Sequence, residues 1–252
     1  MNHIELKKFL DYKANYYESI RFINSDPIKI PHLFSKKEDI EVASFLIASI
    51  SWGNRVSILN SGNKMIELMD SEPFDFVINH QERDLKVFDG FVHRTFNEID
   101  LKFFIRSLQN IYKNHSGLEN LFKPYKSSLQ LGIHNFRSIF FEIDHPKRVE
   151  KHISDPLKGS AAKRLNMFLR WMVRSNAKGV DFGIWKNISP SQLSVPLDVH
   201  TGNIARKLLL IKRKQNDSKT LMELDKKLRI LDPVDPVKYD FALFGLGVFE
   251  KL

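Results

Sequence analysis

Two short stretches of the sequence combine residue types that could do chemistry. The first is LKGSAAKRLNMFL, residues 157–169, in which Gly159 precedes three small residues and then a helical pattern. Glycine permits a tight turn, and small side chains at Ser160, Ala161 and Ala162 leave backbone N–H groups near the surface. Exposed amides at the start of a helix bind phosphate, although an ordinary helix start at a glycine turn has the same appearance.

The second stretch is SVPLDVHTGNIARKL, residues 194–208, which places Asp198 between an apolar run and a helical segment. Aspartate at that position is typical of a helix N-cap, whose carboxylate accepts hydrogen bonds from the first free amides. Capping is compatible with a second, chemical role for Asp198. His200, two residues later, is interpreted as a packing or helix-turn residue rather than a base.

The overall composition limits the kinds of protein that the chain can be. It has 252 residues and a formal net charge of +9, which favours a polyanion such as DNA, RNA or an anionic membrane surface as partner. It has no cysteine, which excludes disulfides, thiolate zinc sites and cysteine-held iron–sulfur clusters. No nucleotide-binding glycine loop, HExxH or EF-hand pattern occurs, so no metal site is expected.

The sequence gives no sign of export or membrane insertion. The first residues, MNHIE, lack a signal-peptide pattern, and no apolar run reaches 18 residues. We therefore expect a cytoplasmic protein that does not associate with a membrane.

Apolar residues recur at helical spacing through most of the chain, and no long stretch of alternating pattern predicts a sheet. The sequence therefore predicts an all-α protein. Helices are expected at residues 3–22, 39–50, 56–69, 100–113, 118–122, 127–132, 134–143, 163–174, 198–209 and 220–231, and a buried apolar helix is expected within residues 232–247, after a start that contains two prolines.

The hairpin stretch and the Asp198 stretch together resemble the helix-hairpin-helix DNA glycosylase superfamily. In that superfamily a Leu-Pro-Gly-Val-Gly-type hairpin carries a lysine, and a Val-Asp-Thr-His segment follows downstream. Matching motif to motif, Lys163 falls at the catalytic lysine and Asp198, 35 residues later, at the catalytic aspartate. The sequence departs from the pattern at the second hairpin glycine, which is Ala161, and at Arg164-Leu165, which replaces Thr-Ala. The spacing between the lysine and the aspartate is also longer than in most branches.

Within that superfamily the chain most resembles an uncharacterised bacterial family of similar length. The shared segments are DPIKIPH, SWGNR, FVHRTF and DPVKYDFALFGLG. The resemblance implies one glycosylase-like unit over residues 1–252, made of two helical subdomains with a cleft between them. One subdomain is expected at 40–145, with a wedge loop at 51–55. The other is expected at 1–39 plus 146–252, with the hairpin at 155–170 and the helix that begins at Asp198.

The resemblance also implies a chemistry for Lys163 and Asp198. Cleavage of a base from deoxyribose leaves positive charge on C1′ and the ring oxygen, which a nearby carboxylate stabilises. A neutral lysine amine can instead attack C1′ and form a Schiff base, and neighbouring cations such as Arg164 favour the neutral amine. Lys163 could alternatively be a phosphate contact in solvent.

A protein that acts on a base must also take it out of the stack. Trp52 is the candidate wedge, with Asn54 and Arg55 beside it, although Trp52 could instead pack in the core. The other DNA contacts are expected from Lys158, Gly159, Ser160, Ala161 and Arg164. Phe182, Trp185 and His93 are weaker candidates for a base pocket, and core packing explains the two aromatic residues equally well. The motif FVHRTF suggests no role for His93 and Arg94 that can be derived from the residues.

The sequence thus predicts a base-excision repair protein, a DNA glycosylase with AP-lyase activity through Lys163 as a further expectation. The expected partner is duplex DNA with a damaged base, the expected state is a monomer, and no cofactor is expected beyond a monovalent cation at the hairpin. The alternatives are a non-catalytic DNA- or RNA-binding protein on the same scaffold, and a helical protein that shares only the fold. The lesion cannot be named from the sequence.

Overall fold

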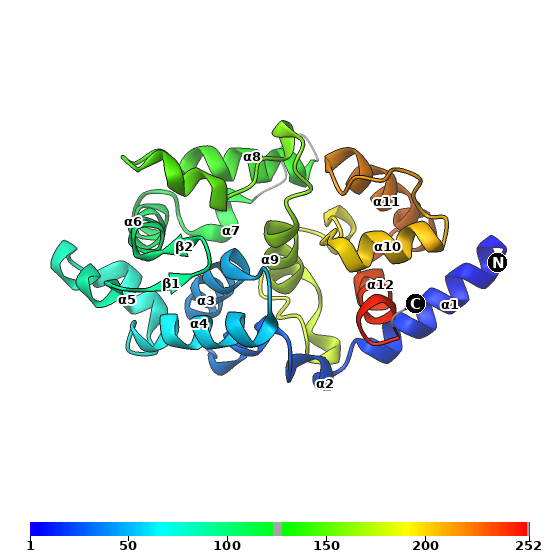
Figure 1. The fold of residues 1–252 in the computed structure, drawn as a ribbon, viewed down its shortest axis with the longest axis horizontal. Coiled ribbons are helices and arrows are strands. Elements are labelled where there is room, and N and C mark those ends of the chain that lie inside the picture. Colours follow the sequence, from blue (N-terminus) through cyan, green and yellow to red (C-terminus); the bar gives the residue numbers. More distant parts are fainter. Residues whose placement is uncertain (123–127, 251) are drawn as a thin grey trace. The chain divides into compact units, whose positions relative to one another are not determined.

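The computed structural model describes residues 1–122, 128–250 and 252, which are mostly helical (Figure 1). The prediction of a mostly helical, all-α chain is therefore confirmed. The α-helices of these residues are α1 His3–Tyr17, α2 Ile20–Ile23, α3 Lys37–Ile50, α4 Arg55–Glu67, α5 Pro73–Asn79, α6 Glu98–Asn114, α7 Leu118–Leu121, α8 Leu129–Phe140, α9 Lys163–Val173, α10 Val199–Lys207, α11 Ser218–Leu231 and α12 Tyr239–Val248. None of these helices is long and apolar enough to cross a membrane.

The chain divides into two compact units, each with its own core. The first unit combines residues 1–22, 124–131 and 155–252, and the second combines 23–123 and 132–154. The expectation from sequence had placed the subdomain boundaries at 39/40 and 145/146. Both the hairpin stretch and the Asp198 stretch belong to the first unit, whereas the SWGNR and FVHRTF segments belong to the second.

The second unit is built around α3, whose residues are buried from Ile40 to Ile50. A helix that is apolar on all sides must be surrounded by other elements. The ring of Phe45 contacts Phe104 of α6, and it also contacts Phe136 and Phe140 of α8. This aromatic cluster joins three helices into one core.

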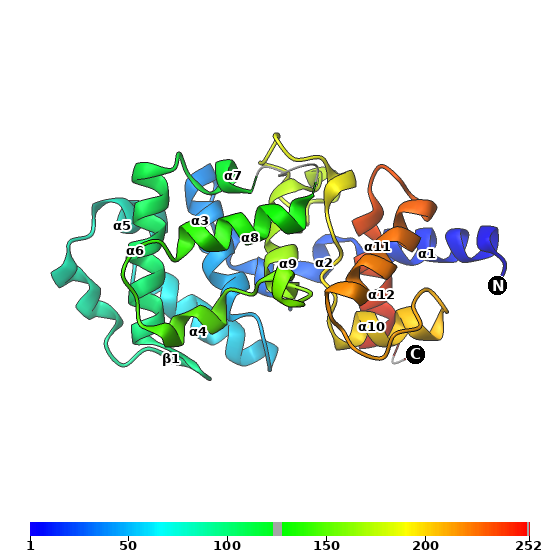
Figure 2. The same cartoon turned by 90° about the horizontal axis from the view of Figure 1, so that it is seen from above.

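The first unit places the N-terminal helix α1 beside the C-terminal helix α12 (Figures 1 and 2). The two helices approach closely at Gly245, where an added Cβ would lie 2.2 Å from Cδ2 of Tyr17. The hydroxyl of Tyr239 on α12 also donates to Asp11 on α1 at 2.9 Å. Helix α10 packs on α12 as well, so α12 lies at the centre of this unit.

Several elements differ from the sequence prediction. The predicted helix 3–22 divides into α1 and α2 because Glu18 leaves the helix and its side chain turns inward to an ion pair. The predicted helices 127–132 and 134–143 form the single helix α8, although Ser127 lies outside the described residues. Helix α5 was not predicted. FVHRTF forms a hairpin of two short strands, β1 Val92–His93 and β2 Phe96–Asn97, which are too brief for a visible alternating pattern.

Candidate functional site

The hairpin that precedes α9 is organised by Asp155 and Gly159. The carboxylate of Asp155 accepts from the amide of Leu157 at 3.0 Å and so starts a short 3₁₀ helix, Pro156–Lys158. Gly159 then has φ +90°, a left-handed conformation that glycine adopts without strain. Nothing lies within 4 Å of a Cβ added there, so backbone conformation rather than space requires the glycine.

The hairpin amides are largely occupied within the protein. Gly159 donates to the carbonyl of Pro156, and Ser160 donates to that of Asp155. The amide of Ala162 donates to Oγ of Ser160 at 3.1 Å. Helix α9 begins directly after Ala162, whose own side chain cannot act as a cap. The amides of Gly159, Ser160 and Ala162 are therefore not available to an anion at the hairpin.

Lys163 is the first residue of α9 and is partly exposed. Its Nζ lies 3.7 Å from Sδ of Met167, one helical turn further on. The next turn holds the hairpin in place, because the buried side chain of Asn166 donates to the carbonyl of Ala161 at 2.9 Å. The position of the Lys163 amine is thus tied to the hairpin by its own helix.

Further along α9, Arg170 and Arg174 enter a buried ion network. Arg170 donates to Asp181 at 3.3 Å and, through Nη1, to Asp240. Arg174 contacts Asp181 at 2.6 Å and two further carboxylates, Glu18 and Asp235. Arg174 is only 4 % exposed, so it is not part of a solvated helix face. Its four-residue spacing from Arg170 aligns both guanidinium groups with acids contributed by other segments.

Asp240, the second residue of α12, connects this network to the predicted catalytic residues. It is 5 % exposed, and burial raises its pKa to about 6 against the opposing effect of Arg170. Asp198 raises the pKa of Asp240 further and Lys163 lowers it. The charges of Lys163 and Asp198 therefore act on the same buried carboxyl group.

Asp198 is the N-cap of α10, as its sequence context indicates. Its Oδ1 accepts from the amide of Thr201 at 2.8 Å, and its backbone carbonyl accepts from the side-chain amide of Asn216 at 2.8 Å. The other carboxylate oxygen, Oδ2, accepts no hydrogen bond within the described part of the chain. His200 is exposed, and its ring lies 6.3 Å from that of Phe244, in keeping with a packing role.

The three groups share one structural setting. Lys163 begins α9, Asp198 caps α10, and Asp240 lies in the first turn of α12. The N-terminal end of a helix carries partial positive charge, which stabilises carboxylates and disfavours an ammonium group. The partial positive charge at the starts of α10 and α12 therefore offsets part of the cost of placing carboxylates there.

In the second unit, the SWGNR segment forms the loop between α3 and α4. Gly53 has φ +95°, and Asn54 caps α4 by accepting from the amides of Val56 and Ser57. Arg55 is the first residue of α4 and is partly exposed. The oxygen of the Asn54 side chain is thus engaged in the cap.

The FVHRTF hairpin packs against this loop. The partly buried ring of Trp52 lies edge-on to His93 at 5.2 Å and stacks on His152 at 6.0 Å. His93 is buried, its Nδ1 is 2.9 Å from Oγ of Ser61, and burial lowers its pKa, so the ring is neutral. The exposed side chain of Arg94 lies over Gly53, where an added Cβ would come within 2.4 Å of its Nη1. The structure thus gives the hairpin a role that its sequence did not reveal.

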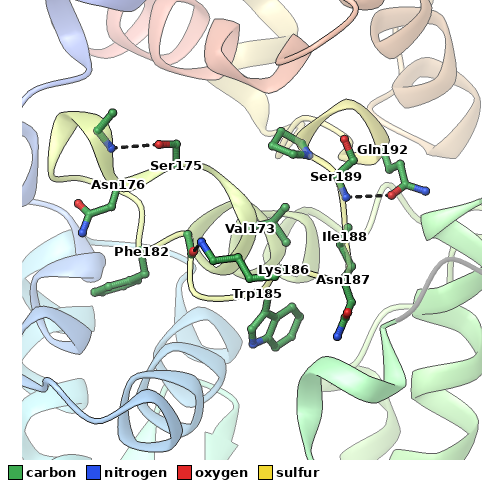
Figure 3. Close-up of a pocket in the computed structure, with 13 residues that line it drawn as sticks. Val173, Ser175, Asn176, Phe182, Trp185, Lys186, Asn187, Ile188, Ser189 and Gln192 are labelled. Carbon is green, nitrogen blue, oxygen red and sulfur yellow. Dashed lines mark hydrogen bonds between the residues drawn. The ribbon is translucent and has the colours of Figure 1, made fainter.

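The weaker base-pocket candidates fall in different places. His93 belongs to the second unit, whereas Phe182 and Trp185 line a cavity of about 750 Å³ in the first (Figure 3). Trp185 is 1 % exposed and lies edge-on to Phe168, which is a core position, and Phe182 is also buried. The polar lining residues of this cavity are Ser175, Asn176, Lys186, Asn187, Ser189 and Gln192.

The ion pairs of two acids in this site were not predicted from the sequence. Asp240 and Asp181 are acids within apolar segments, YDFALFGLG and VDFGIW, and a buried charge in such a context needs a partner. Each acid therefore signalled from the sequence that it has a partner. The partners, Arg170 and Arg174, lie far away in sequence or in a different element, so a local sequence pattern could not identify them.

The fold and the site define an all-α chain with a glycine hairpin, a helix-initial lysine and an aspartate-capped helix in one unit. Comparison with known families gives one match, over residues 26–249, to the family described as "Protein of unknown function (DUF2400)". Because the match covers most of the chain, the protein belongs to this family. No curated protein and no solved structure matches it.

Proposed function

We propose that the protein binds duplex DNA and releases a damaged base, with Lys163 and Asp198 as catalytic residues on a helix-hairpin-helix scaffold. The observation that carries this proposal is a bridge between the two stretches: the side-chain amide of Asn216 donates to the carbonyl of Asp198 at 2.8 Å, and the amide of Ser218 donates to the carbonyl of Gly159 at 3.0 Å. Lys163 begins the helix that follows the hairpin, and Asp198 caps α10. The strongly basic composition supports a nucleic-acid partner.

In the proposed reaction the neutral amine of Lys163 attacks C1′ of the damaged nucleotide. The bond from C1′ to the base breaks, the base leaves with the electron pair and takes up a proton, and the amine loses a proton. Ring opening then gives a Schiff base, which water hydrolyses or which undergoes strand cleavage. The partial positive charge at the N-terminal end of α9 favours the neutral form of the amine that this step requires.

Asp198 has two compatible roles in this scheme. Its Oδ1 holds the first turn of α10, which fixes the carboxylate in position. Its Oδ2 is available to face the positive charge that develops at C1′ or to accept a proton. The cap thus orients the group that the chemistry needs.

The loop at Trp52 supplies the proposed wedge. Its indole is partly exposed and rests on two imidazole rings, which limits its movement. Arg55 and Arg94 place positive charge beside it for contact with the DNA backbone.

A second candidate is a protein that binds DNA or RNA without cutting the glycosidic bond. The burial of Trp185 and Phe182 favours it, because neither ring offers an exposed face on which a flipped base could stack. In that case Lys163 contacts a phosphate, and the hairpin scaffold serves binding alone.

Borohydride trapping separates the two candidates. Wild-type protein, Lys163→Gln and Asp198→Asn are incubated with duplexes that contain 8-oxoguanine, uracil, an alkylated base or an abasic site. A covalent adduct that requires Lys163 supports the catalytic proposal and identifies the lesion. Neither adduct nor base release from any duplex, with DNA still bound, favours the binding protein. Lys158→Gln is the matched control, because it removes an exposed lysine from the hairpin and leaves the proposed nucleophile.

A further inference from the structure

The segment between α10 and α11 is strongly basic. We call residues 212–219 the basic loop; its sequence is KRKQNDSK, and its last two residues are the first two of α11. Lys212, Lys214 and Lys219 are exposed and form no ion pair within the described part of the chain. Arg213 is different, since it contacts Asp217 at 2.5 Å. Three cations thus face solvent from a stretch of eight residues.

The basic loop is attached to both stretches that carry the proposed chemistry. The side-chain amide of Asn216 donates to the backbone carbonyl of Asp198 at 2.8 Å. Two residues later, the amide of Ser218 donates to the carbonyl of Gly159 at 3.0 Å. The loop therefore bridges the hairpin and the N-terminus of α10.

The conformation of the basic loop is fixed by Arg206 of α10. Its guanidinium donates to the carbonyls of Arg213 and Lys214, each at 2.7 Å, and to Oδ1 of Asn216 at 2.6 Å. The loop also lies directly on the helix backbone, because a Cβ added at Gly202 would come within 2.6 Å of the same Oδ1. The donors of Arg206 are thus used to hold the loop.

We propose that the basic loop binds the backbone phosphates of the DNA strand that enters the site, mainly through Lys214 and Lys219. This inference rests on the proposed function for the identity of the partner. The cations are displayed on a backbone that is already ordered, so binding costs less conformational entropy than it would on a mobile segment. Exposed lysines beside a hairpin are suited to phosphate contacts, which fix register and carry no base sequence information.

The test compares Lys214→Ala/Lys219→Ala with Lys226→Ala/Lys227→Ala. The second pair is also exposed, lies further along α11 and removes the same charge. Affinity for an undamaged duplex of about 20 base pairs is measured between about 50 and 200 mM salt. Each phosphate contact contributes a slope of about −0.9 in a plot of log K against log salt concentration. We expect the substitutions Lys214→Ala/Lys219→Ala to make the slope less steep by the equivalent of about two phosphate contacts. The control substitutions should leave the slope unchanged.

Two outcomes would overturn the inference. An equal loss of affinity in both double variants would show that bulk charge accounts for binding. An unchanged slope in Lys214→Ala/Lys219→Ala would show that another surface binds the phosphates. The borohydride assay distinguishes this failure from that of the proposed function. An adduct with an unchanged slope overturns the role of the loop and leaves the catalytic proposal standing. A reduced slope with neither adduct nor base release supports the loop and overturns catalysis. Absence of salt-dependent binding by the wild type overturns both.

Discussion

Nη1 of Arg170 donates a hydrogen bond to Oδ2 of Asp240, and both side chains are almost completely buried. This contact joins α9, which begins at Lys163, to α12. The contact also holds Asp240 in place. The pKa of Asp240 depends on the charges of Lys163 and Asp198.

Removal of the Arg170 guanidinium should be strongly destabilising. Arg170→Leu leaves Asp240 without its cation and deprives Asp181 of one of two, and breaking a buried pair costs about 3–5 kcal/mol. Urea unfolding should show this loss, and the exposed control Lys226→Ala should stay within about 0.5 kcal/mol of the wild type. A loss in Arg170→Leu no larger than that of the control would show that the network does not support the fold.

Substitutions of Asp198 should separate its capping role from its proposed chemical role. Asn is as good an N-cap as Asp, so Asp198→Asn should keep the stability of the wild type, whereas Asp198→Ala should lose about 1 kcal/mol. Both variants should lose base release if the carboxylate stabilises developing charge. Full activity in Asp198→Asn would leave only the cap, and thermal unfolding measured in parallel shows whether the cap is intact.

Asp240 should make stability depend on pH in a defined direction. Its pKa is raised from 3.8 to about 6 in the folded protein, so the folded state binds the extra proton between these values. The contribution of Asp240 to the free energy of unfolding is therefore present at about pH 4 and is lost as pH rises through about 6. Each unit by which its pKa is raised corresponds to about 1.4 kcal/mol. Asp240→Asn cannot titrate, so its stability relative to the wild type should increase from pH 4 to 7.

A matched comparison is available at Asp225, whose pKa is also raised by burial to about 6. Asp225→Asn should remove a similar part of the pH dependence. A difference between Asp240→Asn and wild type that is constant across this range would contradict the assignment of Asp240.

Gly53 and Arg94 should be coupled only weakly. Gly53→Ala places a Cβ at φ +95° and 2.4 Å from Nη1 of Arg94. The exposed arginine can move aside, so we expect backbone strain of about 1–2 kcal/mol to account for most of the loss. The double variant with Arg94→Ala should recover less than about 0.5 kcal/mol, as measured by a double-mutant cycle. Larger recovery would show that Arg94 is held firmly over the loop.

The two tryptophans should respond differently to truncation. Trp185→Ala removes a buried core side chain and should cost about 3–5 kcal/mol. Trp52→Ala should cost less, because the indole is partly exposed, and should weaken DNA binding if Trp52 is the wedge. Binding titrations together with thermal unfolding test both statements. Equal destabilisation with unchanged binding would assign Trp52 to the core.

Local signals made much of the site predictable from the sequence. Gly159 marks a turn because of its backbone freedom, and Asp198 marks a cap because of its place before a helical pattern. The all-α class follows from apolar periodicity. These features depend on a few neighbouring residues, which is why a single sequence suffices to find them.

The remaining features depend on contacts between distant segments. The sequence around Arg174 is typical of a surface residue. In the fold, however, Glu18, which follows α1, and Asp235, which precedes α12, form ion pairs with it. The basic loop has the composition of a solvated turn, and only its contact with Gly159 shows where it lies. No periodicity within one segment reports which other segment it meets.

The composition of the first unit has a consequence for the order in which the protein folds. Residues 23–154, apart from 124–131, form the second unit and are made before most of the first. Domains generally fold as units during synthesis, so the second unit can fold while translation continues. Helix α1 must wait for α12, on which it packs, and α9 must wait for Asp240. The proposed catalytic centre is therefore assembled only after translation has delivered α12, and a ribosome-stalled chain that ends before this helix should have a folded second unit and no activity.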